Sequence, residues 1–140
     1  MKRATVLISL VFCLLLPACA TTNQRVLDMG DQTQLQKRGY QSRAFDTGDK
    51  EKVMRAVIAT MQDLGFIIDR ADLALGTVSG TKLDYNEVRM TVSVRPRGEG
   101  QMLVRANAQY DLRPIEDPVQ YQHFFASLGK TLFLEANAVE

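Results

Sequence analysis

Two neighbouring segments with a strict alternation of apolar and polar residues constrain the fold of this chain most. The apolar positions of the first are Val88, Met90, Val92 and Val94, and those of the second are Met102, Val104, Ala106, Ala108, Tyr110 and Leu112. Because successive side chains of a strand point to opposite faces, each segment predicts a strand with one buried face and one solvated face. Gly98-Glu99-Gly100 lies between them, so the pair is predicted to form an antiparallel hairpin.

The hairpin register follows from the same alternation. Residues that face each other across an antiparallel pair share a face of the sheet, so even positions must lie opposite even positions. A three-residue loop achieves this by placing Val94 beside Val104 and Val92 beside Ala106. Gly100 is then the residue expected at positive φ.

Three further strands are predicted from shorter segments, at residues 41–47, 66–69 and 77–83. The first is expected at an edge of the sheet. A helix is predicted between the first two, with Thr47 or Asp49 as N-cap and Gly65 as the stop. Its apolar stripe consists of Val53, Val57, Met61 and Leu64.

A second helix is predicted near the end of the chain. Asp117 can cap it and Pro118 suits its first turn. Its apolar stripe consists of Tyr121, Phe125, Leu128 and Leu132, widened by Phe124 and Phe133. Gly129 lies in the middle and is expected to mark close approach to the sheet. The element order β-α-β-β-β-β-α therefore predicts an α+β domain at residues 42–140, with an antiparallel sheet packed on two helices.

The first nineteen residues have the pattern of a secretory signal. Lys2 and Arg3 precede an apolar run of 13 residues, which is shorter than the roughly 20 that a spanning helix needs. The run ends in Leu16-Pro17-Ala18-Cys19, which resembles the lipobox of bacterial lipoproteins. The alternatives are an ordinary signal peptide with a coincidental cysteine, or a signal anchor.

The lipobox resemblance implies a signal peptide at residues 1–18, cleavage before Cys19, and acyl chains on the Cys19 sulfur and new amino terminus. Two or three chains make membrane attachment effectively permanent. Ala20, in place of an aspartate, favours the outer membrane. Residues 19–41 have the polar composition of a flexible tether, with a short helix at residues 25–35 as the alternative.

Composition limits the chemistry of the chain. Without Lys2 and Arg3, 15 of the 17 basic residues remain against 16 acidic ones, so a nucleic-acid partner has no electrostatic support. Cys13 lies within the signal, which leaves Cys19 alone and excludes an internal disulfide. His123 is the only histidine, so neither a histidine metal cage nor a Cys-His nucleophile can be built. We expect no cofactor and no enzymatic activity.

The solvated sheet face is the best candidate for a binding surface. It carries Arg89, Arg95, Arg105 and Gln109, interleaved with Thr91, Ser93 and Asn107. These side chains could form a flat hydrogen-bonding surface for a protein or glycan. The alternative is an ordinary solvated face of an antiparallel sheet.

The order of elements over residues 41–138 resembles the helix-grip domain of the lipoprotein C subunit of the outer-membrane β-barrel assembly machinery. The resemblance carries no functional residues across. We expect a membrane-anchored periplasmic lipoprotein that acts as a non-catalytic binding or assembly accessory of the cell envelope, with an envelope protein as partner. The alternative is a carrier of a lipid or other apolar ligand, held between the last helix and the sheet in a groove lined by Tyr121, Phe124, Phe125 and Phe133.

Overall fold

The computed structural model describes residues 34–137, which form an α+β fold of three helices and a six-stranded antiparallel sheet. The chain divides into two compact units at Gln36, and all the labelled elements belong to the second unit, which begins at Lys37. The strands are β1 (Ser42–Phe45), β2 (Ile67–Asp72), β3 (Thr77–Asp84), β4 (Asn86–Arg97), β5 (Gln101–Tyr110) and β6 (Arg113–Pro114). The labelled helices are α3 (Lys50–Asp63) and α4 (Pro118–Asn137), and residues 34–41 are also helical.

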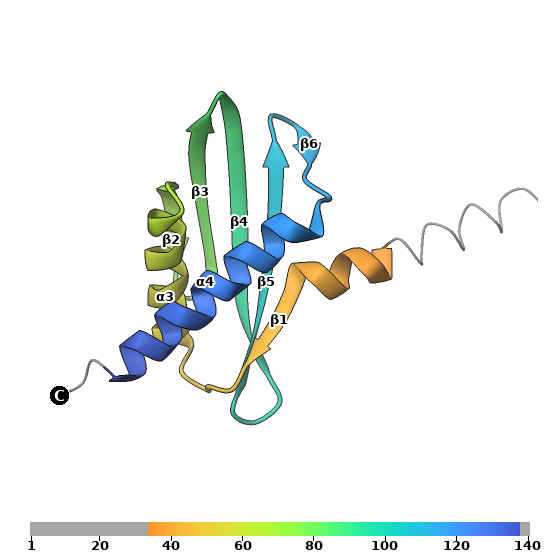
Figure 1. Cartoon of the computed structure of the whole chain (residues 1–140). Coiled ribbons are helices and arrows are strands. Elements are labelled where there is room, and N and C mark those ends of the chain that lie inside the picture. Colours follow the sequence, from red (N-terminus) through yellow and green to blue (C-terminus); the bar gives the residue numbers. More distant parts are fainter. Residues whose placement is uncertain (1–33, 138–140) are drawn as a thin grey trace, which may run out of the picture. The chain divides into compact units, whose positions relative to one another are not determined.

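The sheet has the strand order β1-β5-β4-β3-β2, and β6 pairs with β5 on the same side as β1 (Figure 1). β1 therefore lies at an edge, as predicted. The hairpin of β4 and β5 has the predicted register, with Val94 opposite Val104 and Val92 opposite Ala106. Gly100 adopts a φ of 85°, also as predicted, and Gly98 adopts 59°.

The turn from β2 to β3 requires a glycine at position 76. Gly76 has a φ of 66°, and its carbonyl accepts a hydrogen bond of 2.8 Å from the amide of Val94. A Cβ atom at this position would run into the Val94 carbonyl oxygen and the Lys50 side chain. Glycine is thus needed both for the backbone conformation and for the close approach of the turn to β4.

Helix α3 has the predicted ends. Asp49 is its N-cap, and the carboxylate accepts a hydrogen bond of 2.9 Å from the Lys52 amide. Gly65 follows the C-cap Leu64 and adopts a φ of 85°, the left-handed conformation that commonly ends a helix. Between these two ends, the buried stripe of α3 packs against the sheet.

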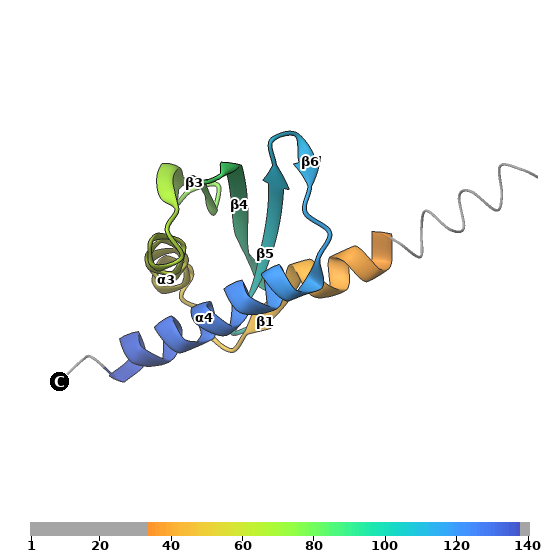
Figure 2. The same cartoon turned by 45° about the horizontal axis from the view of Figure 1, so that its top comes forward.

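Both labelled helices lie on the same side of the sheet (Figure 2). The core combines one stripe of each helix with even-numbered residues of β3, β4 and β5. Its members are Val53, Met54, Ala56, Val57, Met61, Phe66, Val78, Met90, Val92, Val94, Met102, Val104, Ala106, Ala108, Tyr121, Phe124, Phe125 and Leu128. The Thr60 hydroxyl of α3 lies 3.1 Å from that of Thr131 on α4 and donates to it, so a hydrogen bond also joins the helices. The prediction of one covered face is confirmed.

The hydroxyl of Tyr121 satisfies three polar groups in this core. It donates to the carbonyl of Ile115 at 2.8 Å and accepts from the amide of Ala108 at 3.1 Å. It also accepts from the side-chain amide of Gln41 at 3.3 Å. Tyr121 is 1% exposed, so these bonds form away from water. They satisfy the edge of β5 in the gap between its pairing with β1 and its pairing with β6.

The prediction of a flexible tether as far as residue 41 is wrong for residues 34–41, which are helical. Tertiary contacts explain the difference, because the rings of Tyr40 and Tyr121 lie 5.3 Å apart and Lys37 forms an ion pair with Glu116. This hydrogen bond to Glu116 raises the pKa of Lys37. The signal, Cys19 and the rest of the tether lie outside the described residues.

Two smaller expectations also fail. Gly129 does not mark close approach to the sheet, because a Cβ atom there would have no neighbour within 4 Å among the described residues. The two-residue strand β6 was not predicted, since Pro114 gave no strand signal and the strand depends on pairing with Gln109 and Tyr110 of β5.

Candidate functional site

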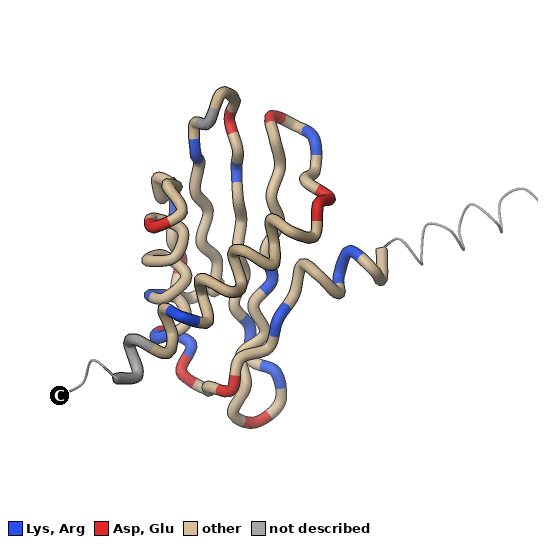
Figure 3. The backbone as a smooth tube through the Cα atoms, in the orientation of Figure 1, with Lys and Arg blue, Asp and Glu red and all other residues tan. Residues whose placement is uncertain are grey.

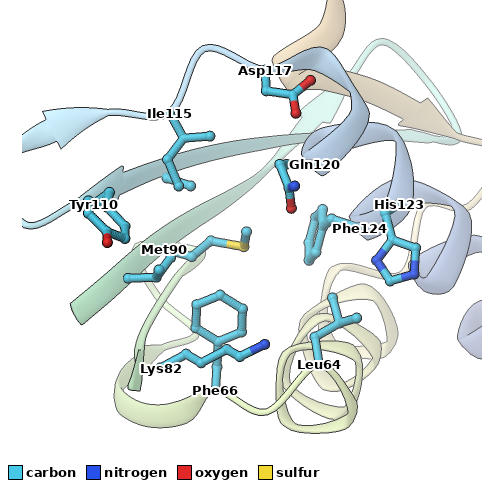
Figure 4. Close-up of a pocket in the computed structure, with 12 residues that line it drawn as sticks. Leu64, Phe66, Lys82, Met90, Tyr110, Ile115, Asp117, Gln120, His123 and Phe124 are labelled. Atoms are coloured by element: carbon cyan, nitrogen blue, oxygen red, sulfur yellow. The ribbon is translucent and has the colours of Figure 1, made fainter. Parts of the chain in front are cut away.

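A pocket of about 570 Å³ lies between α3, α4 and the apolar sheet face, at the end of the sheet nearest the turn from β3 to β4 (Figure 4). Its walls come from the turn that ends α3, from three strands, from the segment before α4 and from α4 itself. The lining residues are Leu64, Phe66, Lys82, Val88, Met90, Ala108, Tyr110, Ile115, Asp117, Gln120, His123 and Phe124. The pocket therefore assembles residues that are far apart in the sequence.

The floor of the pocket is apolar because it continues the buried side of the β4–β5 hairpin. Met90 lies opposite Ala108, and Val88 lies opposite Tyr110. Ala108 has a side chain of one carbon, so it fills little of the space above the sheet. Phe66 enters from the turn after α3 and is buried, and Phe124 enters from α4.

Polar side chains surround this apolar floor. Asp117 directly precedes α4, Gln120 lies in its first turn, and Lys82 comes from β3 (Figure 4). The carboxylate of Asp117 also accepts a hydrogen bond of 2.9 Å from the Val119 amide and so caps the helix. An apolar interior with a polar margin suits a ligand that has an apolar body and a polar end.

His123 lies on the exposed side of α4 and contributes to the wall of this pocket (Figure 4). No hydrogen bond links His123 to a carboxylate among the described residues. It contributes a polar group to the pocket and does not form a catalytic pair with the acids described here.

The groove expected from the sequence is different from the pocket observed. Of its four aromatic residues, only Phe124 lines the pocket. Tyr121 and Phe125 are 1% exposed and belong to the closed core. Phe133 is 69% exposed and contributes, with Ala126, Gly129 and Lys130, to a shallow depression on α4. The aromatic stripe of α4 therefore fills the core more than it lines a cavity.

The candidate binding residues Arg89, Arg95, Arg105 and Gln109 share the sheet face opposite the helices, as predicted. Arg89 lies opposite Gln109, and Arg105 lies opposite Ser93. Arg89 and Gln109 contribute, with Thr91 and Asn107, to a hollow of about 250 Å³. Arg95 and Arg105 lie outside that hollow, so the structure divides the predicted face into two parts.

Within residues 34–137, no cluster of three or more histidine, cysteine, aspartate or glutamate side chains is arranged to hold a metal ion. In the same range, no helix is both long enough and apolar enough to span a bilayer. Burial raises the pKa of Tyr40 beside the Lys37–Glu116 pair.

Sequence reasoning missed most of the pocket. Met90 and Ala108 were predicted to face the core, and this alternation was the available signal for the floor. Leu64 and Ile115 lie more than forty positions apart in the sequence, and nothing in the sequence indicated that both would line the same pocket. No protein-family model and no curated protein matches this chain.

Proposed function

We propose that this chain is a membrane-anchored lipoprotein of the cell envelope, held in the outer membrane through Cys19, with a non-catalytic binding domain that faces the periplasm. Within that class, the carrier of a lipid or other apolar ligand has the more specific support. The observation that supports it is the pocket between the two helices and the sheet. The anchor itself is supported by the lipobox at residues 16–19.

The size and lining of the pocket favour a ligand with an apolar body. Its volume of about 570 Å³ is within the range of roughly 300–1,000 Å³ that is typical of small-molecule sites. Leu64, Phe66, Met90, Ile115 and Phe124 provide an apolar surface from four separate segments. A ligand that covers this surface removes it from water, which is the main source of affinity in such sites.

The test is binding of a fluorescent apolar probe, anilinonaphthalene sulfonate, to the chain from residue 19 onward with Cys19→Ser. Val88 lines the pocket, so Val88→Phe fills part of it and is expected to weaken probe binding by at least tenfold. Val119→Phe is the matched control, because Val119 is exposed on α4 and does not line the pocket. Equal loss in both variants, or no loss in Val88→Phe, would contradict the carrier proposal.

Extraction of the purified wild-type protein with organic solvent, followed by mass spectrometry, identifies the natural ligand. A molecule that co-purifies with wild type and Val119→Phe but is depleted in Val88→Phe supports the carrier. A molecule retained equally by all three proteins is bound elsewhere.

The second candidate is the assembly accessory that recruits an envelope protein. The open sheet face supports it, because the hollow beside Arg89 and Gln109 presents side chains that donate and accept hydrogen bonds. Crosslinking in intact cells, followed by mass spectrometry, compares wild type with Cys19→Ser. Capture of the same envelope proteins only from correctly anchored wild type supports the accessory, and failure to capture any protein from anchored material contradicts it.

A further inference from the structure

Three arginines on the open sheet face lie together at the hairpin end of β4 and β5. Arg95 and Arg97 are two positions apart on β4, so their side chains leave the same face at a spacing of about 7 Å. Arg105 of β5 lies opposite Ser93 of β4. It is therefore a diagonal neighbour of Arg95, at roughly 7–8 Å. Figure 3 shows both basic and acidic segments at this end of the sheet. We call Arg95, Arg97 and Arg105 the arginine row.

The arginine row differs from the other arginines of the same face in its partners. Arg89 forms an ion pair of 2.7 Å with Glu87, and Arg70 forms one of 3.6 Å with Asp72. Among residues 34–137, no ion pair involves a member of the arginine row. The Nε atom of Arg105 is buried and has no hydrogen-bond partner within this range.

The surroundings of the arginine row do not neutralise it. Glu99 lies in the hairpin loop, and the Asp46 carboxylate already accepts a hydrogen bond of 2.6 Å from the Gln101 side chain. Among residues 34–137, no ion pair joins either of these carboxylates to the arginine row. The surface therefore favours an anionic partner, although residues 19–140 as a whole have a net charge of −1.

We propose that the arginine row docks the domain onto an anionic phospholipid surface. Guanidinium groups bind phosphate oxygens through paired hydrogen bonds, and Ser93 adds a hydroxyl beside Arg105. The hollow of this face lies beside Arg89, and no member of the arginine row lines it. This contact goes beyond the proposed function, because it uses neither the ligand pocket nor the acyl chains.

The test uses the chain from residue 19 onward with Cys19→Ser, so that acyl chains do not contribute. Its sedimentation is measured with vesicles of phosphatidylcholine alone and with vesicles that also contain phosphatidylglycerol. We expect binding only to the second kind, and we expect it to weaken as salt screens the charges. Each Arg→Gln change in the row should lower the partition coefficient by roughly fivefold, and the triple change by more than tenfold.

A matched control removes three positive charges from the helix side of the domain. Lys52, Arg55 and Lys130 lie on α3 and α4, and replacing all three by Gln alters the net charge by the same amount. This control should retain at least half of the wild-type binding. Arg→Lys changes at the three row positions should retain more binding than the Gln changes, and circular dichroism verifies that every variant is folded.

Several outcomes would overturn the proposal. These are binding that does not depend on phosphatidylglycerol, and an equal loss of binding in the control triple variant. A third is absence of vesicle binding by a folded wild-type chain, together with crosslinks to an envelope protein that require the arginine row. That last result would assign the row to a protein partner.

Discussion

The two ends of the apolar sheet face are built from the same alternating strands but differ in how they are covered. At the hairpin end, Val92, Val94 and Val104 are at most 1% exposed and share one core with Phe125 and Leu128 of α4. At the other end, the same strands form the floor of an open pocket. Apolar alternation therefore determines which face is buried, whereas the path of the helices determines whether that face becomes core or cavity.

The strongest test of this comparison removes an aromatic ring from the closed end. Phe125→Ala is expected to lower the free energy of unfolding by about 3–5 kcal/mol, because the buried ring is lost and the surrounding core cannot close the cavity fully. Urea denaturation measures the effect. A loss below about 1 kcal/mol would show that this end is as loosely packed as the pocket, and the comparison would fail.

A second test concerns the hydrogen bonds by which the buried Tyr121 holds two residues of the pocket lining, Ala108 and Ile115. Tyr121→Phe removes the hydroxyl and leaves the Ala108 amide and the Ile115 carbonyl without that partner. The expected loss is about 1–3 kcal/mol by urea denaturation, since buried polar groups then remain unsatisfied. Hydrogen exchange at Ala108 should accelerate in the variant, and unchanged exchange would argue that water replaces the hydroxyl freely.

A third test examines the side of α4 that faces away from the sheet. Gly129→Ala is expected to stabilise the domain by about 0.5–1 kcal/mol, because alanine favours the helix and no described atom lies within 4 Å of its Cβ position. Thermal unfolding followed by circular dichroism measures the change. Destabilisation would mean that a neighbour approaches Gly129 in the full-length protein.

Local sequence patterns were sufficient to predict most of the fold. The hairpin register followed from the parity of the alternation and the glycines at positions 98 and 100, all within one short segment. The caps at Asp49 and Gly65 likewise depend on neighbouring residues. The helix at residues 34–41 could not be predicted in this way, because its contacts are with Tyr121 and Glu116, about eighty positions away.

The candidate surfaces show the same limit. The sequence predicted that Arg89, Arg95 and Arg105 share a face, but it did not indicate which of them would form an ion pair. Glu87 lies two positions before Arg89 on the same strand and pairs with it, so a local signal was present and was not used. The pocket had no such signal, because it depends on where α4 crosses the sheet and on which distant side chains reach the remaining space.

The smallest expected effect comes from filling the open end. Val88→Phe adds volume at a site that lines the pocket, so the free energy of unfolding should change by less than about 0.5 kcal/mol. The same enlargement in a closed core typically costs about 1–3 kcal/mol, because side chains and backbone must move to admit it. Val94→Phe provides that reference on the same strand and face, since Val94 is fully buried. Urea denaturation of both variants should therefore separate the two ends of the sheet, and equal losses would show that the pocket is closed in solution.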